Sequence, residues 1–306
     1  MSSLTDFDVE MLVTPLAGAD PAGIPLPFDV REQLDKGRKI DPFEPSSKPD
    51  WPKLERLAKD TLTNTSKDLL VAVRLVEAIT VLHGFAGLNA GLELLTRLID
   101  ECWERLHPVP EPGDDWEVRI NQLEWLNKAT QGGQFPQTLN SLPLLQWERD
   151  QAWSRFDWQN PTRRAELETT LSAWDRVKRP EPVLKLRQTF AEIVEAEKRL
   201  AQLSKVVDQR LPEAGLNLLT GTGTLGGELE GCKLALEGMA NKFKIALTET
   251  QAPATTQTTG TTATSADALR QNRRRARTDR VRCETAFWWS GDFVVRTFGS
   301  PDRKGE

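Results

Sequence analysis

The first candidate for chemistry is a glycine-rich stretch, Gly221-Thr-Gly223-Thr-Leu-Gly226, which has the spacing G-x-G-x-x-G. In dinucleotide-binding proteins this spacing follows a strand and opens a helix, so that the backbone can approach a pyrophosphate. Here the preceding residues, 216–219, stand among segments of helical periodicity, with no second strand pattern nearby. We therefore interpret the stretch as a loop between helices. The sequence contains no G-K-S or G-K-T, so it has no P-loop.

A second candidate is the run Ser66-Lys67-Asp68, in which a lysine stands beside a potential nucleophile. A simpler interpretation is that Ser66 caps a helix and that Asp68 lies near the positive end of the helix dipole. The two histidines, His83 and His107, both fall near predicted helix C-termini, where an imidazole can bond to carbonyl groups that lack partners. We predict a structural role for these residues.

The sequence contains few residues suited to metal binding or redox chemistry. The three cysteines, Cys102, Cys232 and Cys283, are far apart and odd in number, so they fit neither a disulfide framework nor a zinc site. Two histidines also leave little for acid–base catalysis. We therefore predict no catalytic, cofactor-binding or metal site, and a protein that is not an enzyme.

The most basic segment is Arg270–Arg282, which holds seven arginines in thirteen residues. Such a segment attracts phosphate backbones by counterion release. It shows no recognisable nucleic-acid-binding fold, and the whole chain has a formal net charge of −5. We expect no nucleic-acid partner, and a nucleic-acid-binding adaptor that uses this segment is the alternative function.

The elements that must position these residues are predicted to be helices. Residues 1–50 are rich in proline and form an extended arm that packs on the core, with a short helix around Val30–Lys36. Beyond residue 50, apolar residues repeat every three to four positions, and short connections indicate antiparallel packing. The predicted helix starts are Asp50, Ser66, about Gly87, Asp114 or Asp115, Thr162, about Val183 and about Leu225. The predicted helix stops include Gly84, His107-Pro108, Pro180 with Pro182, Leu211 and Leu247.

This pattern gives an all-α fold in which an antiparallel helical bundle, 1–145, is followed by a smaller helical middle region, 146–249. Residues 250–266 contain eight threonines and neither charge nor large apolar groups, which predicts a disordered linker. No apolar run approaches the roughly 18–20 residues of a membrane span, and the N-terminus has no signal-peptide pattern. We expect a soluble, cytoplasmic protein. Trp51, Trp103, Trp125 and the Leu88–Leu98 face are predicted to be core.

An ordered series of residues within 12–145 is more specific than any motif above, and its positions are those predicted for caps, turns and helix contacts. The series is Asp20, Pro21, Gly23, Trp51, Ser66, Lys67, Asp68, Glu77, Gly84, Phe85, Gly87, Leu88, Gly91, Leu92, Trp103, His107, Pro108, Arg119, Trp125 and Asn127. It resembles the ImpA-related N-terminal domain found in TssA-type proteins of bacterial type VI secretion. The resemblance implies shared architecture rather than catalysis.

For function, the resemblance implies a non-enzymatic component of the secretion apparatus. TssA-like proteins associate with the baseplate and the membrane complex, and the long forms coordinate assembly of the tail sheath and inner tube. The implied partners are therefore baseplate, membrane-complex, sheath and tube subunits. The resemblance also implies self-association through a C-terminal domain, and a cytoplasmic location at the inner face of the inner membrane through partner proteins.

The C-terminal residues depart from this pattern. Ser265–Gln271 resembles the start of the C-terminal helical domain of the family, and the resemblance stops there. We interpret residues 267–306 as a nonstandard basic tail, with ten basic and six acidic side chains, that replaces a frameshifted or truncated C-terminal domain. Our hypothesis places the frameshift near Asn272, and it requires an intact downstream reading frame in the gene. Loss of that domain would weaken self-association.

Overall fold

The computed structural model describes residues 7–38, 48–110, 116–127, 135–148, 151–177, 181–212, 214–221 and 223–248. The chain divides into two units, Met1–Thr250 and Gln251–Glu306, and all described residues belong to the first. The predicted linker, the basic tail with Cys283, the caps Asp114 and Asp115, and Pro180 lie outside the described residues.

The described part of the chain is helical apart from one small hairpin, so the predicted all-α fold class is confirmed. The elements, in chain order, are α1 (Val9–Val13), α2 (Phe28–Gly37), α3 (Trp51–Asn64), α4 (Leu69–Cys102), α5 (Glu117–Glu124), α6 (Phe135–Thr138), a 3-10 turn (Leu139–Ser141), β1 (Leu145–Glu148), β2 (Gln151–Trp153), α7 (Arg155–Gln159), α8 (Pro161–Val177), α9 (Glu181–Arg210) and α10 (Leu225–Lys242). The antiparallel strands β1 and β2, which the sequence did not predict, pair Leu145 with Trp153.

The longest element, α4, is two helices that meet at Gly84. Gly84 has φ +64° and ψ −143°, a conformation that strongly favours glycine, so the predicted stop at this residue is confirmed. A Cβ on Gly87 would overlap the carbonyl of Ile79, and one on Gly91 would lie 2.9 Å from Val76 Cγ1. These contacts join residues on both sides of Gly84 in reverse order, so the second half of α4 folds back along the first. The close helix contact predicted at Gly87 and Gly91 is therefore confirmed.

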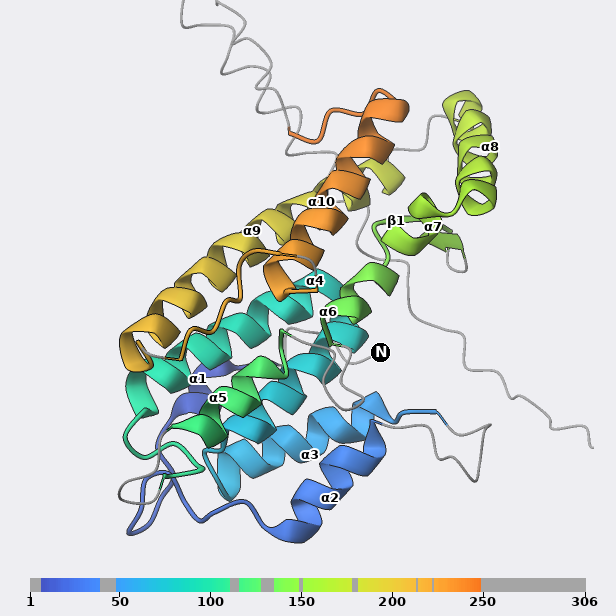
Figure 1. Ribbon diagram of the computed structural model, residues 1–306. Helices are drawn as coiled ribbons and strands as arrows, with labels where there is room; N and C mark the ends of the chain where they lie inside the picture. Colours follow the sequence, from blue (N-terminus) through green and yellow to red (C-terminus); the bar gives the residue numbers. More distant parts are fainter. Residues whose placement is uncertain are drawn as a thin grey trace, which may run out of the picture. The chain divides into compact units, whose positions relative to one another are not determined.

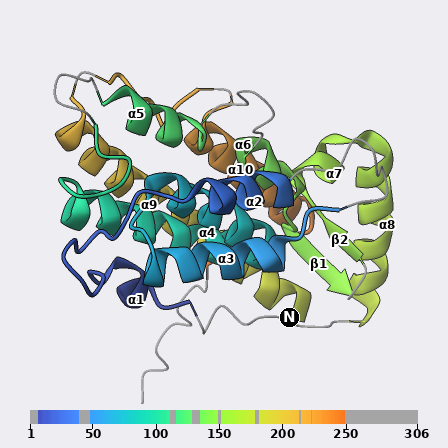
Figure 2. The same cartoon turned by 90° about the horizontal axis from the view of Figure 1, so that it is seen from below.

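This hairpin is the centre of the core. Both α3 and α9 pack along α4, and α10 packs on α9 (Figures 1 and 2). Leu88, Leu92, Leu95 and Leu98 are buried, as predicted, and Phe85 is buried as well. Because neighbours cover most of its sides, α4 is apolar nearly all round, as expected of a buried helix.

The apolarity of α4 corrects one expectation from the sequence. A window of 18 residues in Leu69–Cys102 has a mean hydropathy of 1.8, so by length and composition this stretch could cross a bilayer. The expectation that no apolar run approaches a membrane span is therefore wrong. In the structure 72% of that window is buried inside the fold and the chain reverses at Gly84, which is the setting of a core hairpin.

Polar contacts attach α9 to both of its neighbours. The Asn89 side chain donates to the carbonyl of Glu192 at 2.9 Å, and Arg210 donates to the carbonyl of Asp100 at 2.7 Å. On the other side, Lys233 of α10 pairs with Glu197 at 2.7 Å. Helices on the two sides of the predicted boundary at residue 145 thus pack on each other, and the division into two regions stays a prediction.

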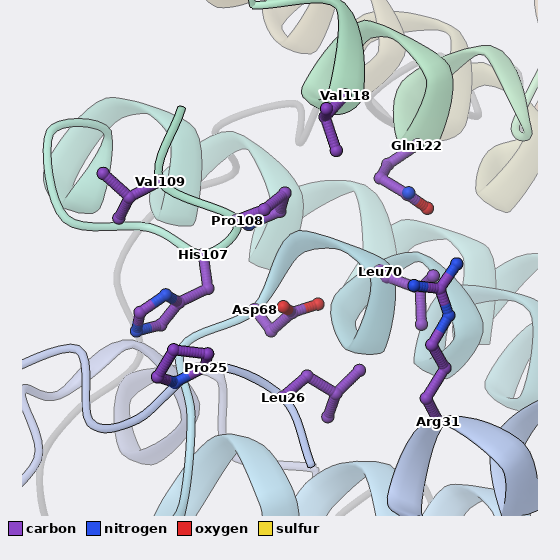
Figure 3. Close-up of a pocket in the computed structure, with 10 residues that line it drawn as sticks. All are labelled: Pro25, Leu26, Arg31, Asp68, Leu70, His107, Pro108, Val109, Val118 and Gln122. Atoms are coloured by element: carbon purple, nitrogen blue, oxygen red, sulfur yellow. The ribbon is translucent and has the colours of Figure 1, made fainter. Parts of the chain in front are cut away.

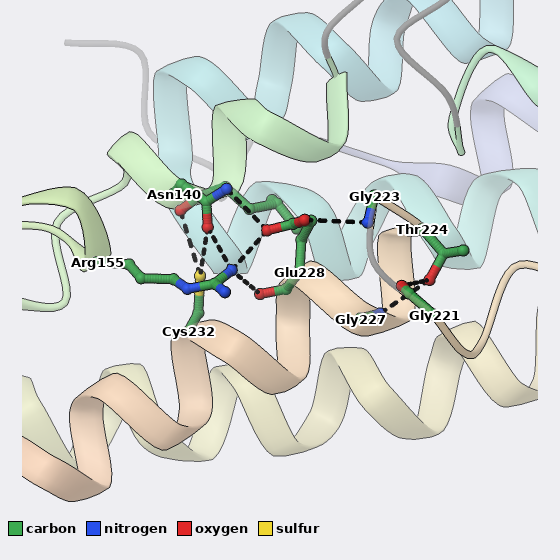
Figure 4. Close-up of polar contacts among 9 residues, drawn as sticks. Asn140, Arg155, Gly221, Gly223, Thr224, Gly227, Glu228 and Cys232 are labelled. Carbon is green, nitrogen blue, oxygen red and sulfur yellow. Dashed lines mark hydrogen bonds and ion pairs between the residues drawn. The ribbon is translucent and has the colours of Figure 1, made fainter. Parts of the chain in front are cut away.

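A buried polar network fixes the start of α10 to the segment around α7 (Figure 4). Arg155 Nη1 donates to Glu228 Oε2 at 2.5 Å and to Asn140 Oδ1 at 2.7 Å. Asn140 Nδ2 donates to the same Glu228 oxygen at 2.8 Å, and Gly223 N donates to the other at 3.3 Å. The buried thiol of Cys232 lies 3.4 Å from the carbonyl of Leu139, and burial raises its pKa to about 12. The pairing of Arg155 with Glu228 removes the cost of leaving either charge alone inside the fold.

Several predicted boundaries differ from the structure for local reasons. The arm contains α1, which the sequence did not predict, and the helix predicted at Val30–Lys36 is longer, as α2. Trp51, predicted to be core, is half-buried because it is the first residue of α3, whereas Trp103 and Trp125 are buried. α10 ends at Lys242, five residues before the predicted stop.

We predict that Leu92→Asp unfolds this part of the chain. Leu92 is fully buried in the hairpin, and an unpaired carboxylate there adds a desolvation cost to the lost apolar contacts, a loss of about 4 kcal/mol or more in the free energy of unfolding. Urea unfolding followed by circular dichroism measures this change. Leu234→Asp is the control, because Leu234 is 59% exposed on α10. A native helical signal and an unchanged midpoint in Leu92→Asp would contradict the prediction.

Candidate functional site

The segment that joins α3 to α4 pairs with main chain on both of its sides. On one side Lys67 N donates to the carbonyl of Ala22 at 2.8 Å, and Ile24 N donates to that of Thr65 at 3.1 Å. On the other side His107 N donates to the carbonyl of Lys67 at 2.8 Å, and Leu69 N donates to that of His107 at 2.9 Å. The N-terminal arm, this junction and the exit from α4 therefore lie side by side.

The helix cap at this junction is Asp68, not Ser66 as predicted. Asp68 Oδ1 accepts from Val71 N at 3.2 Å, whereas Ser66 is fully buried and its Oγ has no hydrogen-bond partner among the described residues. The main chain of Ser66 forms a β-bridge with Gly23, so Ser66 is not free to cap the helix, which begins only after Asp68. Burial raises the pKa of the Asp68 carboxyl to about 6, against the opposing effect of its backbone hydrogen bonds.

Lys67 connects the arm to α3. Its Nζ donates to the carbonyls of Leu12 and Leu62, both at 2.7 Å, and the residue is 1% exposed. Burial lowers the pKa of its ammonium group to about 8. Because the ammonium faces these carbonyls and the Ser66 hydroxyl is sealed from solvent, the two side chains do not form a catalytic pair.

Arg119 of α5 holds the turn that follows α4. Its guanidinium donates to the carbonyls of Trp103 at 2.6 Å and Pro108 at 2.9 Å, and to that of Leu106. It also lies over the rings of Trp103 and Trp116, at 4.4 and 4.6 Å from their centroids. Burial lowers the pKa of Arg119 to about 10. Three main-chain oxygens of the turn that follows α4 are thus satisfied by one planar cation.

A third buried cation, Arg38, fixes the end of α2. It makes a bidentate ion pair with Glu77, with Nε–Oε2 at 2.9 Å and Nη2–Oε1 at 3.1 Å, and both side chains are 6% exposed. Arg38 and Arg74 lie over the Trp125 ring at 3.9 and 4.0 Å from its centroid. Sequence reasoning identified Glu77 and Trp125 but missed both arginines, since each partner lies far along the chain and no local spacing marks it.

Other residues of the series, polar and non-polar, fix turns. Asp20 Oδ1 accepts from Ala22 N at 2.8 Å, Pro21 accepts from Leu16 N at 2.8 Å, and Gly23 has φ +79° where a Cβ would overlap the carbonyl of Thr65. Asn127, after α5, donates to the carbonyl of Asn217 and accepts from Leu225 N at 3.0 Å. That contact brings the first residues of α10 against the α5 segment.

The predicted bonds from histidine rings to helix-end carbonyls are not made by Nε2 of either histidine. The main chain of His107 pairs with the junction, but its ring nitrogen Nε2 is buried without a hydrogen-bond partner among the described residues. His83 Nε2 also has none there, and it lies 3.8 Å from Glu55 Oε1. Gly221 and Gly223 lie in a loop as predicted, whereas Gly226 lies in α10, which begins at Leu225. Thr224 caps this helix, since its Oγ1 accepts from Gly227 N at 3.1 Å.

The junction borders a hollow of about 330 Å³ (Figure 3). Apolar side chains from four segments line it, including Leu26 of the arm, Leu70 of α4, Val109 of the turn after α4 and Val118 of α5. Its polar lining is Arg31, Asp68, His107 and Gln122. Three residues of the predicted series, Asp68, His107 and Pro108, thus meet at a concave surface that the sequence did not reveal. Within the described ranges, acidic, histidine and cysteine side chains do not gather into a group that could hold a metal ion.

Comparison with known proteins gives three findings. Residues 13–128 match the family described as ImpA, N-terminal, type VI secretion system. The type VI secretion system component TssA1 of Pseudomonas aeruginosa is 32% identical over 130 residues, which are 39% of this chain and 38% of that relative. The third match is a solved structure, the N-terminal domain, including the conserved ImpA N-terminal region, of the TssA component from Burkholderia cenocepacia. It matches with a TM-score of 0.60 and 24% identity, and the match covers 78% of this chain and 96% of that one.

These matches confirm the predicted resemblance to TssA-type proteins. The chain aligns with little more than a third of the curated relative, whereas the structural match extends well beyond residues 13–128. The likeness to the solved structure shows that the middle helices are part of the same fold.

We expect Asp68→Asn to change how stability depends on pH. A carboxyl group whose pKa rises from 3.8 to about 6 on folding stabilises the fold below pH 4, and that contribution is lost as the pH rises through 6. Asparagine still caps the helix but does not titrate. The difference in Tm, variant minus wild type, should therefore increase between pH 4 and pH 7. A flat difference, with the Asp68 carboxyl titrating near 4 by NMR, would contradict this account.

Arg119→Lys should destabilise the fold by about 2–3 kcal/mol, because a single ammonium cannot reach all three carbonyls and leaves buried oxygens unpaired. Urea unfolding followed by tryptophan fluorescence measures the loss. The matched control is Arg56→Lys on the exposed side of α3, which should change the midpoint little. Equal midpoints for the two variants would show that the turn does not depend on Arg119.

Proposed function

Because residues 13–128 match the ImpA N-terminal family of type VI secretion, we propose that the protein is a non-enzymatic assembly component of such a system. We infer that it acts in the cytoplasm, at the inner face of the inner membrane through other subunits. Its partners would be baseplate, membrane-complex, sheath or tube proteins, and it would also self-associate.

The observation that carries the proposal is that the polar residues that resemble the family hold the fold together. Lys67 and Arg119, the polar groups a reaction could use, donate to main-chain carbonyls that hold the arm and turns together. Asp68 caps α4. Buried side chains committed in this way make the fold rigid and leave little for substrate chemistry, which supports a role in binding proteins rather than in catalysis.

Pairwise co-expression tests the proposal. The full chain is produced with one tagged subunit at a time, taken from the sheath, tube, baseplate and membrane-complex proteins encoded by the same genome. We expect at least one subunit to co-purify through a wash at high salt, which removes contacts made by charge alone. The control bait is Leu92→Asp, whose predicted unfolding should abolish capture. Failure of every pair, with the wild-type chain folded, would contradict the proposed function.

A further inference from the structure

We propose that the hollow beside Asp68 receives a segment of a partner protein in which an apolar side chain stands next to an acidic one. The inference rests on the proposed function and names the surface and the partner chemistry. Four features of the hollow support it: a buried ring nitrogen, a cation, an exposed apolar rim and a suitable size.

The buried ring nitrogen belongs to His107. The residue is 7% exposed and lines the hollow, and its Nε2 has no hydrogen-bond partner among the residues that the structure describes. A buried polar atom without a partner is costly, so each one in a native protein calls for an explanation. An amide or hydroxyl of an incoming peptide can donate to this nitrogen.

The cation is Arg31 of α2. Figure 3 shows Arg31 and His107 on opposite sides of Asp68. Arg31 is exposed, and within the described residues no carboxylate lies within 4.0 Å of its guanidinium. Asp68 is close enough for Arg31 to influence its pKa, but the carboxylate of Asp68 is already bonded to the backbone at the start of α4. Arg31 is therefore the charge that an acidic partner residue can pair with.

The apolar rim consists of side chains that the fold leaves uncovered. Val109 is 52% exposed and Val118 is 47% exposed, and both line the hollow. In the arm segment that supplies Leu26 to the hollow, Ile24 is 57% exposed and Phe28 is 78% exposed. The volume of about 330 Å³ is at the lower end of the range of ligand pockets, which suits one inserted side chain better than a folded surface.

Binding of short peptides to matched variants tests the inference. The probes tile the sheath, tube, baseplate and membrane-complex subunits of the same genome, and each acidic peptide has a copy with lysine in place of its acidic residues. The hollow variants are Arg31→Glu and Val118→Lys. The matched controls are Arg56→Glu on α3 and Leu234→Lys on α10, both at exposed positions. All four should keep the wild-type Tm.

We expect bound peptides to carry an acidic residue next to an apolar one and to lose binding in the lysine copies. The hollow variants should weaken binding about tenfold or more, and the controls should bind as wild type does. The His107 ring nitrogen should also shift in the NMR spectrum on addition of the tightest peptide. Failure of all peptides to bind, or equal binding by hollow variants and controls, would overturn the inference.

The co-expression assay separates this inference from the proposed function. If subunits co-purify equally with the hollow variants and with the controls, the inference is wrong and the proposed function stands. If no subunit co-purifies even with the wild-type chain, the proposed function is wrong, and the peptide measurements alone decide whether the hollow binds acidic–apolar segments.

Discussion

The constraint on which the rest of the structure depends is the need to satisfy buried main-chain carbonyls where helices end and begin. A helix leaves its last four carbonyls without partners, and burying them unpaired is costly. At the junction between α3 and α4 this need is met by main-chain pairing on two sides and by the buried ammonium of Lys67. In the turn after α4, Arg119 satisfies main-chain carbonyls that the turn leaves without partners. Both cations lose hydration on burial, and the lowered pKa of each shows that cost.

The reversal of α4 makes these contacts possible. Because the helix folds back at Gly84, residue 107 returns to the junction at residue 68, and the arm lies on the other side of the same segment. The hollow depends on the same reversal, since the arm, the start of α4 and the turn after α4 supply three of its walls, and α2 and α5 complete it. Stability and the proposed binding surface therefore share one set of backbone contacts.

Much of the helical framework could be predicted from apolar spacing, glycine and capping residues. Asp50 caps α3 as predicted, and the turn at Gly84 was correctly placed. The choice between Ser66 and Asp68 as a cap could not be made, because both residue types cap helices and main-chain pairing with the arm decides the matter. The carbonyl partners of Lys67 and Arg119 could not be predicted either. Every residue carries a main-chain carbonyl, so no local sequence pattern identifies the one that accepts.

Because Lys67 and Arg119 bind main-chain oxygens, some positions of the sequence can vary more freely than others. Lys67 and Arg119 bind main-chain oxygens at Leu12, Leu62, Trp103, Leu106 and Pro108. The hydrogen bond is indifferent to the side chain at the accepting position, so those positions can drift, within the limits of packing, without loss of the contact. The donor positions have less freedom, because only lysine and arginine carry several N–H donors on a side chain of this length. At these contacts, selection therefore falls on the residues that donate, and substitution at the accepting positions is comparatively neutral.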